Sequence, residues 1–224
     1  MREPVEALIF DMDGTVVDNM GVHGEAWGAW HDREVLPFDG DTFFARTAGR
    51  TNAEIIAALY PERTVEEIAR LGEAKQAVYR ELYGPRVKAV DGLTELLGAA
   101  ENRGLRLALA TAAPPPNIAL VLDALSLRAR FEAIVSPALG LRGKPYPDIF
   151  LHAAQQLGVP PSRCLVFEDA PLGVEAARRA RMRVVALTTT LGLSDFAAFD
   201  NVIETRGDFR GFDLEAVGSA PTTA

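Results

Sequence analysis

A series of short apolar runs, each of which stops at a polar or charged residue, constrains the fold more than any other feature. The first run covers residues 7–10 and stops at Asp11. Similar runs follow at 105–110, 133–135, 164–167 and 183–187, with a weaker one at 201–203. Apolar runs of this length without polar alternation are typical of strands buried on both faces, as in a parallel sheet.

Helical patterns separate the runs in the second half of the chain. They cover residues 91–103, 147–157 and 172–180. Strand and helix therefore alternate, which predicts βαβ units. The expected fold class is α/β, with a doubly wound parallel sheet that carries helices on both faces.

Residues 18–87 break this alternation, because they contain helical patterns only. The patterns lie at 21–33, 39–48, 52–60 and 64–82. We expect antiparallel-packed helices, inserted directly after the first strand. Residues 1–17 and 88–217 then form one discontinuous α/β domain, and 218–224 a flexible tail.

Composition limits the possible partners. The net charge of −8 argues against non-specific binding of nucleic acid or of anionic membranes. The lone cysteine, Cys164, excludes an intramolecular disulfide and agrees with a reducing compartment. No apolar run approaches the roughly 20 residues of a membrane span, and the start of the chain lacks a signal peptide pattern. We expect a cytoplasmic protein, a monomer or weak dimer, that binds neither nucleic acid nor membranes.

Residues able to do chemistry gather where the apolar runs end. Because the carboxyl ends of parallel strands meet at one edge of the sheet, these residues are expected to surround one crevice. Carboxylates together with a lysine and a hydroxyl are typical of a site for Mg²⁺ and phosphate. An acidic turn in solvent is the alternative for the first loop alone. The set is Asp11, Asp13, Thr111, Lys144, Glu168 and Asp169.

These segments resemble the motifs of the haloacid dehalogenase superfamily, in its phosphatase and phosphomutase branch. The resemblance spans residues 7–177 and implies a Rossmann-like core with an α-helical cap, here residues 18–87. It also implies a Mg²⁺ cofactor and a small phosphorylated metabolite as substrate. The matching segments, in order, are Asp11-Met12-Asp13-Gly14-Thr15, Thr111, Gly143-Lys144-Pro145, and Phe167-Glu168-Asp169-Ala170 with Gly173.

The resemblance also implies roles for the acidic residues. Asp11 is expected to attack phosphorus as the nucleophile and to ligate the metal, giving an aspartyl phosphate. Asp13 is expected to act as the general acid and base, while its backbone carbonyl binds Mg²⁺. Asp169 is the further metal ligand, and Glu168 either ligates the metal or supports a ligand.

The remaining matches are expected to hold the phosphate. Thr111 and Lys144 bind the oxygens of the phosphoryl group, with Lys144 supplying positive charge. Gly14 and Thr15 contribute backbone N–H groups. Ala112, directly after Thr111, is a candidate substrate contact.

Within the cap region, residues 18–27 resemble β-phosphoglucomutase and related sugar phosphatases. His23 matches a histidine that helps to position the general acid, although a structural histidine is an equal alternative. Arg50, Thr51 and Asn52 resemble the specificity loop at a helix start, where anions bind readily; a solvated surface arginine is the alternative for Arg50. Lys75 is a further candidate substrate contact.

The favoured function is Mg²⁺-dependent hydrolysis of a small, sugar-like phosphate monoester. A β-phosphoglucomutase-type isomerase is the first alternative. It is disfavoured because residues 112–116 read Ala-Ala-Pro-Pro-Pro where the mutase has polar and basic side chains. Arg50 is also displaced by two residues from the mutase arginine. A catalytically silent binding or regulatory protein is the second alternative, disfavoured because Asp11, Asp13, Lys144 and Asp169 are all present.

Overall fold

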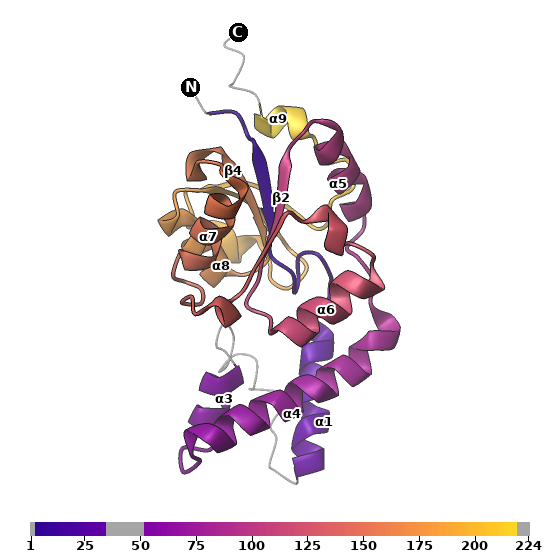
Figure 1. The fold of residues 1–224 in the computed structure, drawn as a ribbon, viewed down its shortest axis with the longest axis vertical. Helices are drawn as coiled ribbons and strands as arrows, with labels where there is room; N and C mark the ends of the chain where they lie inside the picture. Colours follow the sequence, from indigo (N-terminus) through magenta and orange to yellow (C-terminus); the bar gives the residue numbers. More distant parts are fainter. Residues whose placement is uncertain (1–2, 35–51, 219–224) are drawn as a thin grey trace. The chain divides into compact units, whose positions relative to one another are not determined.

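A six-stranded, fully parallel sheet forms the centre of the larger unit in the computed structural model, which describes residues 3–34 and 52–218 (Figure 1). The strand order is β3-β2-β1-β4-β5-β6. This confirms the predicted parallel α/β sheet, although the last strand is longer than its apolar pattern indicated. The strands are β1 (Ala7–Phe10), β2 (Arg106–Ala110), β3 (Ala133–Val135), β4 (Cys164–Glu168), β5 (Arg183–Leu187) and β6 (Val202–Arg206).

The strand order reverses direction at β1. The chain passes from β1 to β2 and β3 on one side, and then returns to place β4 on the other side of β1. Phe10 pairs with Phe167 in register, and the N–H of Asp11 donates to the carbonyl of Phe167 at 3.0 Å. The ends of β1 and β4 therefore lie together at the position where open α/β sheets bind their ligands.

Helices cover both faces of this sheet. Figure 1 shows α7 and α8 on one face and α5 on the other. The helix α6 is not among the predicted elements, and it begins with Pro115 and Pro116 in its first turn. Proline is tolerated in the first helical turn, where the N–H has no intrahelical partner. The helices are α5 (Leu93–Asn102), α6 (Pro115–Ala124), α7 (Asp148–Leu157), α8 (Pro171–Arg179) and α9 (Leu214–Gly218), with short 3₁₀ turns at 128–130, 137–139, 161–163 and 193–196.

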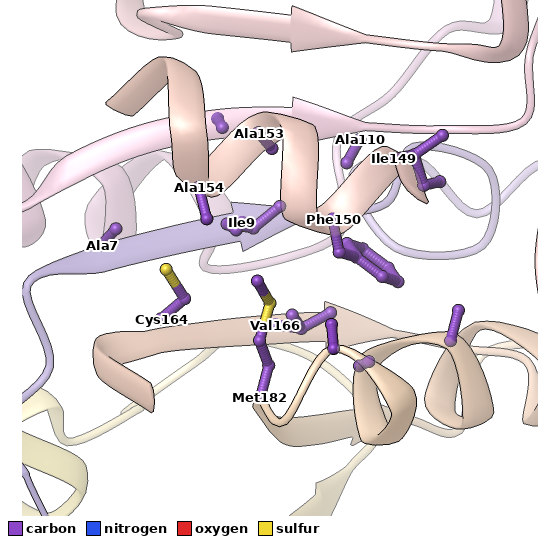
Figure 2. Packing of buried hydrophobic residues seen from close by; sticks show 14 of the residues in the cluster. Ala7, Ile9, Ala110, Ile149, Phe150, Ala153, Ala154, Cys164, Val166 and Met182 are labelled. Carbon is purple, nitrogen blue, oxygen red and sulfur yellow. The ribbon is translucent and has the colours of Figure 1, made fainter. Parts of the chain in front are cut away.

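The side chains of β1 alternate between two apolar layers. Ala7 and Ile9 pack with α7, through Phe150 and Ala153 among others, as Figure 2 shows. On the opposite face, Phe10 stacks on Phe167 with ring centroids 4.6 Å apart. Burial on both faces explains why β1 is entirely apolar up to Asp11.

The second compact unit is helical. The chain divides into residues 1–18 with 88–224, and residues 19–87. The helical unit contains α1 (Met20–Glu34), α3 (Asn52–Leu59) and α4 (Val65–Tyr83), followed by a 3₁₀ turn at 84–86. The helix predicted at 39–48 lies outside the described residues, as does most of the predicted tail. No helix in the described ranges has the length and apolar character that crossing a membrane requires.

A capping box fixes the start of α4. The hydroxyl of Thr64 accepts the backbone N–H of Glu67 at 3.2 Å, and the Glu67 carboxylate accepts the backbone N–H of Thr64 at 2.9 Å. Two N–H groups of the first turn are thereby satisfied. The sequence Thr-x-x-Glu therefore begins the helix where the pattern predicted it.

Candidate active site

Three buried carboxylates and one lysine meet at the carboxyl ends of β1 and β4. Oxygen atoms of Asp11, Glu168 and Asp169 lie within 4.8 Å of one another. Lys144 Nζ lies 2.9 Å from Asp11 Oδ1 and also donates to Glu168 Oε1. The loop at 143–145 therefore brings its lysine to the strand ends, as the parallel topology predicted.

The charges of this cluster do not balance. Burial, together with repulsion from Glu168 and Asp13, raises the pKa of Asp11 to about 7, despite the opposing effect of Lys144. Burial and the neighbouring Glu168 and Asp11 also raise the pKa of Asp169 well above its ordinary value. The two carboxylates hold the pKa of Lys144 above its usual range, against the effect of its burial.

A divalent cation fits this arrangement. Three carboxylates facing one ammonium leave an excess of negative charge when all are ionised. This repulsion, together with burial, is why the pKa values of Asp11 and Asp169 are raised. Hard cations such as Mg²⁺ prefer carboxylate and carbonyl oxygens. The carboxylate oxygens of Asp11, Glu168 and Asp169 form a suitable donor set.

Glu168 is held from three sides. Its Oε2 accepts the N–H groups of Asp169 at 2.8 Å and Ala170 at 2.9 Å, while Lys144 donates to Oε1. A Cβ at Gly173 would lie 1.8 Å from Oε1, so only glycine leaves room for the carboxylate there. Glu168 thus orients Lys144, and Gly173 makes that orientation possible.

The loop after β1 turns tightly at Gly14, which has φ +78°. The N–H of Gly14 donates to the Val17 carbonyl at 2.7 Å, and the N–H of Thr15 donates to the Met12 carbonyl at 3.2 Å. Thr15 is also fully buried. Both N–H groups already have acceptors within the loop, and their role in binding phosphate stays a prediction. Asp13, in contrast, is partly exposed.

Thr111 begins the loop after β2 and is 1% exposed. Its N–H donates to the Val135 carbonyl at 3.0 Å, and its Oγ1 accepts the N–H of Ala113 at 3.1 Å. The hydroxyl proton remains available to an acceptor outside this pair. Ala112 is exposed beside it.

Known proteins show the same organisation. A sequence model of the haloacid dehalogenase-like hydrolases matches residues 5–181. The chain belongs to this family. In agreement, a haloacid dehalogenase hydrolase of family IA from Entamoeba histolytica superposes with a TM-score of 0.88, at 26% identity, over 95% of this chain and 97% of that one.

Relatives of this hydrolase carry several names. Protein CbbY of Rhodobacter capsulatus is 36% identical, over 88% of this chain and 91% of that protein. Validoxylamine A 7'-phosphate phosphatase of Streptomyces hygroscopicus subsp. limoneus is 31% identical, over 89% and 93%. A beta-phosphoglucomutase of Bacillus subtilis is also 31% identical, over 82% and 83%. The family therefore includes both phosphatases and a mutase at similar distances from this chain.

In the helical unit, the hydrolase places two predicted substrate contacts in one cluster. Lys75 is fully buried, with Nζ 3.0 Å from His23 Nδ1 and 4.9 Å from the centre of the Trp27 ring. The His23 ring stacks on Tyr79, with centroids 4.0 Å apart. Since an ammonium only donates, His23 Nδ1 accepts this hydrogen bond.

Of the other contacts predicted for the helical unit, the structure describes Asn52 only. Asn52 is the first residue of α3 and is partly exposed. Arg50 and Thr51 lie outside the described residues. The roles of all three residues in substrate binding remain predictions.

Two residues of the hydrolase site were missed by sequence reasoning. Thr190 Oγ1 donates to Asp169 Oδ2 at 2.5 Å, and Thr189 Oγ1 donates to the carbonyl of Gly14. They belong to a run of three threonines that follows β5 at Leu187. The rule that located Asp11, Thr111 and Glu168, a polar residue after a buried strand, also applies to this run.

Proposed function

We propose that this haloacid dehalogenase-like hydrolase is a Mg²⁺-dependent phosphatase for a small, sugar-like phosphate monoester. The buried cluster of Asp11, Lys144, Glu168 and Asp169 carries the proposal. It combines a carboxylate nucleophile, a lysine held by two carboxylates, and oxygen donors suited to a divalent cation. The sugar-phosphate character is suggested by relatives whose names describe phosphatases of phosphorylated carbohydrates and of fructose 1-phosphate.

The first half of the proposed reaction transfers the phosphoryl group to the enzyme. A carboxylate oxygen of Asp11 attacks phosphorus, and the bond from phosphorus to the ester oxygen breaks. Asp13 gives its proton to the departing oxygen, so the substrate leaves as a neutral alcohol. Lys144 and the Thr111 hydroxyl hold the phosphoryl oxygens, where negative charge must be stabilised.

The second half releases phosphate. Asp13, now ionised, accepts a proton from water while the water oxygen attacks phosphorus of the aspartyl phosphate. The bond between phosphorus and the Asp11 oxygen breaks, which restores Asp11 as a carboxylate and leaves Asp13 protonated for the next cycle. Asp11, Asp169 and the Asp13 carbonyl would hold Mg²⁺, which would supply positive charge and let an anionic substrate approach anionic residues. The hydrogen bonds of Glu168 to Lys144 and to two amides favour a supporting role for Glu168 over direct ligation.

The two parts of the chain have different roles in the proposed reaction. Residues 1–17 and 88–217 are the catalytic core, and residues 18–87 are the cap that selects the substrate. His23, Arg50, Thr51, Asn52 and Lys75 are the proposed cap contacts, and Ala112 is the proposed contact from the core. The proposed setting is the cytoplasm, with the chain as a monomer or weak dimer.

The test is hydrolysis of p-nitrophenyl phosphate with Mg²⁺ by the wild type and by Asp11→Asn. We expect the variant to lose at least about 1,000-fold in rate, as removal of a nucleophile does elsewhere. Asp123→Asn is the matched control, because Asp123 is an exposed residue of the same unit, paired only with Arg128 at 3.1 Å in the described structure. Equal rates for the wild type and Asp11→Asn would overturn the proposal and favour a catalytically silent binding protein. A panel of phosphorylated metabolites, scored by phosphate release, then identifies the substrate.

A β-phosphoglucomutase-type activity is the second candidate, because a beta-phosphoglucomutase is among the relatives. Hydrolysis is favoured, since Pro114, Pro115 and Pro116 have no N–H to offer a second phosphate at the start of α6. The discriminating assay supplies β-glucose 1-phosphate with a trace of glucose 1,6-bisphosphate. Formation of glucose 6-phosphate faster than free phosphate would overturn the choice of hydrolysis.

A further inference from the structure

A pair of adjacent hydroxyls joins two loops of the proposed metal site. Thr190 Oγ1 donates to Asp169 Oδ2 at 2.5 Å, and Thr189 Oγ1 donates to the Gly14 carbonyl. Asp169 follows β4, while Gly14 belongs to the loop after β1. The segment after β5 therefore contacts both loops that carry the proposed metal ligands.

Little space surrounds the Asp169 carboxylate. A Cβ at Gly14 would lie 2.0 Å from Asp169 Oδ2 and 2.8 Å from Thr190 Oγ1, so these three residues converge on one point. Asp169 is 3% exposed. With solvent nearly excluded, the Thr190 hydroxyl is the group placed to fix the rotation of the carboxylate.

Thr188, the first threonine of the run, behaves differently. Its N–H donates to the carbonyl of Arg206 at 2.9 Å, which continues the pairing between β5 and β6. Within the described part of the chain, its hydroxyl makes no hydrogen bond to Asp169 or Gly14. Only after Thr188 does the segment turn toward the candidate active site.

We infer that Thr190 is a positioning residue that orients Asp169 to bind the divalent cation, with Thr189 holding the Gly14 turn against it. The inference rests on the proposed function and deepens it. A hydroxyl that donates to a carboxylate forms a strong, charge-assisted hydrogen bond. Replacing such a partner of a metal ligand typically costs about 10–100-fold in metal affinity or activity.

The test measures Mg²⁺ binding without substrate, as the rise in unfolding temperature of the full chain during a Mg²⁺ titration. For Thr190→Val, which keeps the side-chain shape but lacks the hydroxyl, we expect the Mg²⁺ concentration at half-maximal stabilisation to rise about 10-fold or more. Thr190→Ser restores the donor and is expected to stay within about 3-fold of the wild type. Thr188→Val, the matched control, is expected to match the wild type.

Equal Mg²⁺ binding by Thr190→Val and the wild type would overturn the inference, as would an absence of any Mg²⁺ effect on the wild type. If Thr190→Val does not fold without metal, Thr190→Ala takes its place in the same titration. Failure of the proposed function is a separate result, since it is seen as a wild type that binds Mg²⁺ yet hydrolyses no phosphate ester. Kinetics add a second readout: Thr190→Val should raise the Mg²⁺ requirement for hydrolysis more than the KM for p-nitrophenyl phosphate.

Discussion

The two units of this hydrolase hold their buried polar groups in different ways. At the sheet edge, Lys144 contacts Asp11 and Glu168, and Asp169 accepts the Thr190 hydroxyl, so these groups have partners from other strand-end loops. In the helical unit, Lys75 and His23 are packed against the rings of Trp27 and Tyr79 on the same two helices. The sheet edge is therefore ordered by backbone topology, and the helical cluster by side-chain packing.

This difference determines what each unit tolerates. A displaced loop at the sheet edge separates charges that must act together, so activity should be lost before stability. Truncating a buried aromatic ring or the aliphatic part of Lys75 in the helical unit leaves a cavity, so stability should be lost first. Substitutions in the two units should therefore separate loss of activity from loss of stability.

Gly173→Ala is expected to have the largest effect. The new Cβ would meet Glu168 Oε1 at 1.8 Å, and Glu168 cannot move easily because Lys144 and two backbone amides hold it. Displacing Glu168 misplaces Lys144, and a misplacement of about 1 Å costs on the order of 100-fold in rate. The measurement is kcat/KM for p-nitrophenyl phosphate.

Gly98→Ala is the matched control, since Gly98 also lies within a helix of the same unit. A Cβ there would lie 3.7 Å from Arg130 Nη2, its nearest neighbour outside the backbone of its own helix, which is an ordinary contact. We expect unchanged activity and a small gain in stability, because alanine favours helices over glycine. Wild-type activity in Gly173→Ala would contradict the role of Glu168 in aligning Lys144.

The sheet edge was also the part that the sequence predicted well. Asp11 and Glu168 could be placed together because buried strands are recognisable and parallel strands share one carboxyl edge. Thr190 was missed because the run of three threonines after β5 contains no charged residue that would indicate a catalytic or metal site. The amides of Gly14 and Thr15 donate to carbonyls within the tight turn itself, and their expected contacts with phosphate stay a prediction. Such local closure depends on φ and ψ, which residue types alone do not specify.

The helical unit was predicted in outline only. Its helices followed from apolar spacing, but the pattern could not tell which polar residue turns inward. The sequence predicts that Lys75 contacts the substrate, and the structure shows in addition that Lys75 is buried beside His23. Burial of a lysine depends on rings supplied by another helix, and no local pattern encodes that contact.

Lys75→Ala is expected to destabilise the helical unit by about 2–4 kcal/mol, the range for deleting a large buried side chain. Both tryptophans of the chain lie on α1, so their fluorescence during urea unfolding reports on this unit. Lys75→Met keeps the stem volume and should cost less. Lys88→Ala is the control, because the Lys88 side chain is 79% exposed. A raised KM for Lys75→Met at unchanged stability would support the proposed substrate contact of Lys75 and would contradict the view that this cluster acts first on stability.

His31 should make the stability of the helical unit depend on pH. Burial lowers its pKa below the usual 6.5, although Nδ1–H donates to the Trp27 carbonyl at 2.7 Å. The folded unit favours neutral His31, while the unfolded chain takes up a proton near pH 6.5. This contribution is therefore complete above pH 6.5 and is lost as the pH falls through the lowered pKa.

The measurement for His31 is the urea midpoint from tryptophan fluorescence at pH 7 and at pH 5. We expect the midpoint to fall on acidification in the wild type, and to fall less in His31→Gln. His152→Gln, on α7 of the other unit, is the matched control and should keep the wild-type dependence. An identical fall of the urea midpoint in His31→Gln and the wild type would show that protonation of His31 is not coupled to unfolding.

Thr64→Ala is expected to have the smallest effect. It measures how much the N-terminal cap of α4 alone contributes to the stability of the helical unit. The variant loses the hydroxyl that accepts the N–H of Glu67 at 3.2 Å, and with it half of the capping box at the start of α4. Loss of such a cap costs about 1 kcal/mol, and Thr64→Ser should restore most of it. The same fluorescence experiment measures both variants, and hydrolysis of p-nitrophenyl phosphate should be unchanged. A loss as large as that of Lys75→Ala would mean that α4 is held by its cap as much as by its buried face, so packing alone would not explain the stability of this unit.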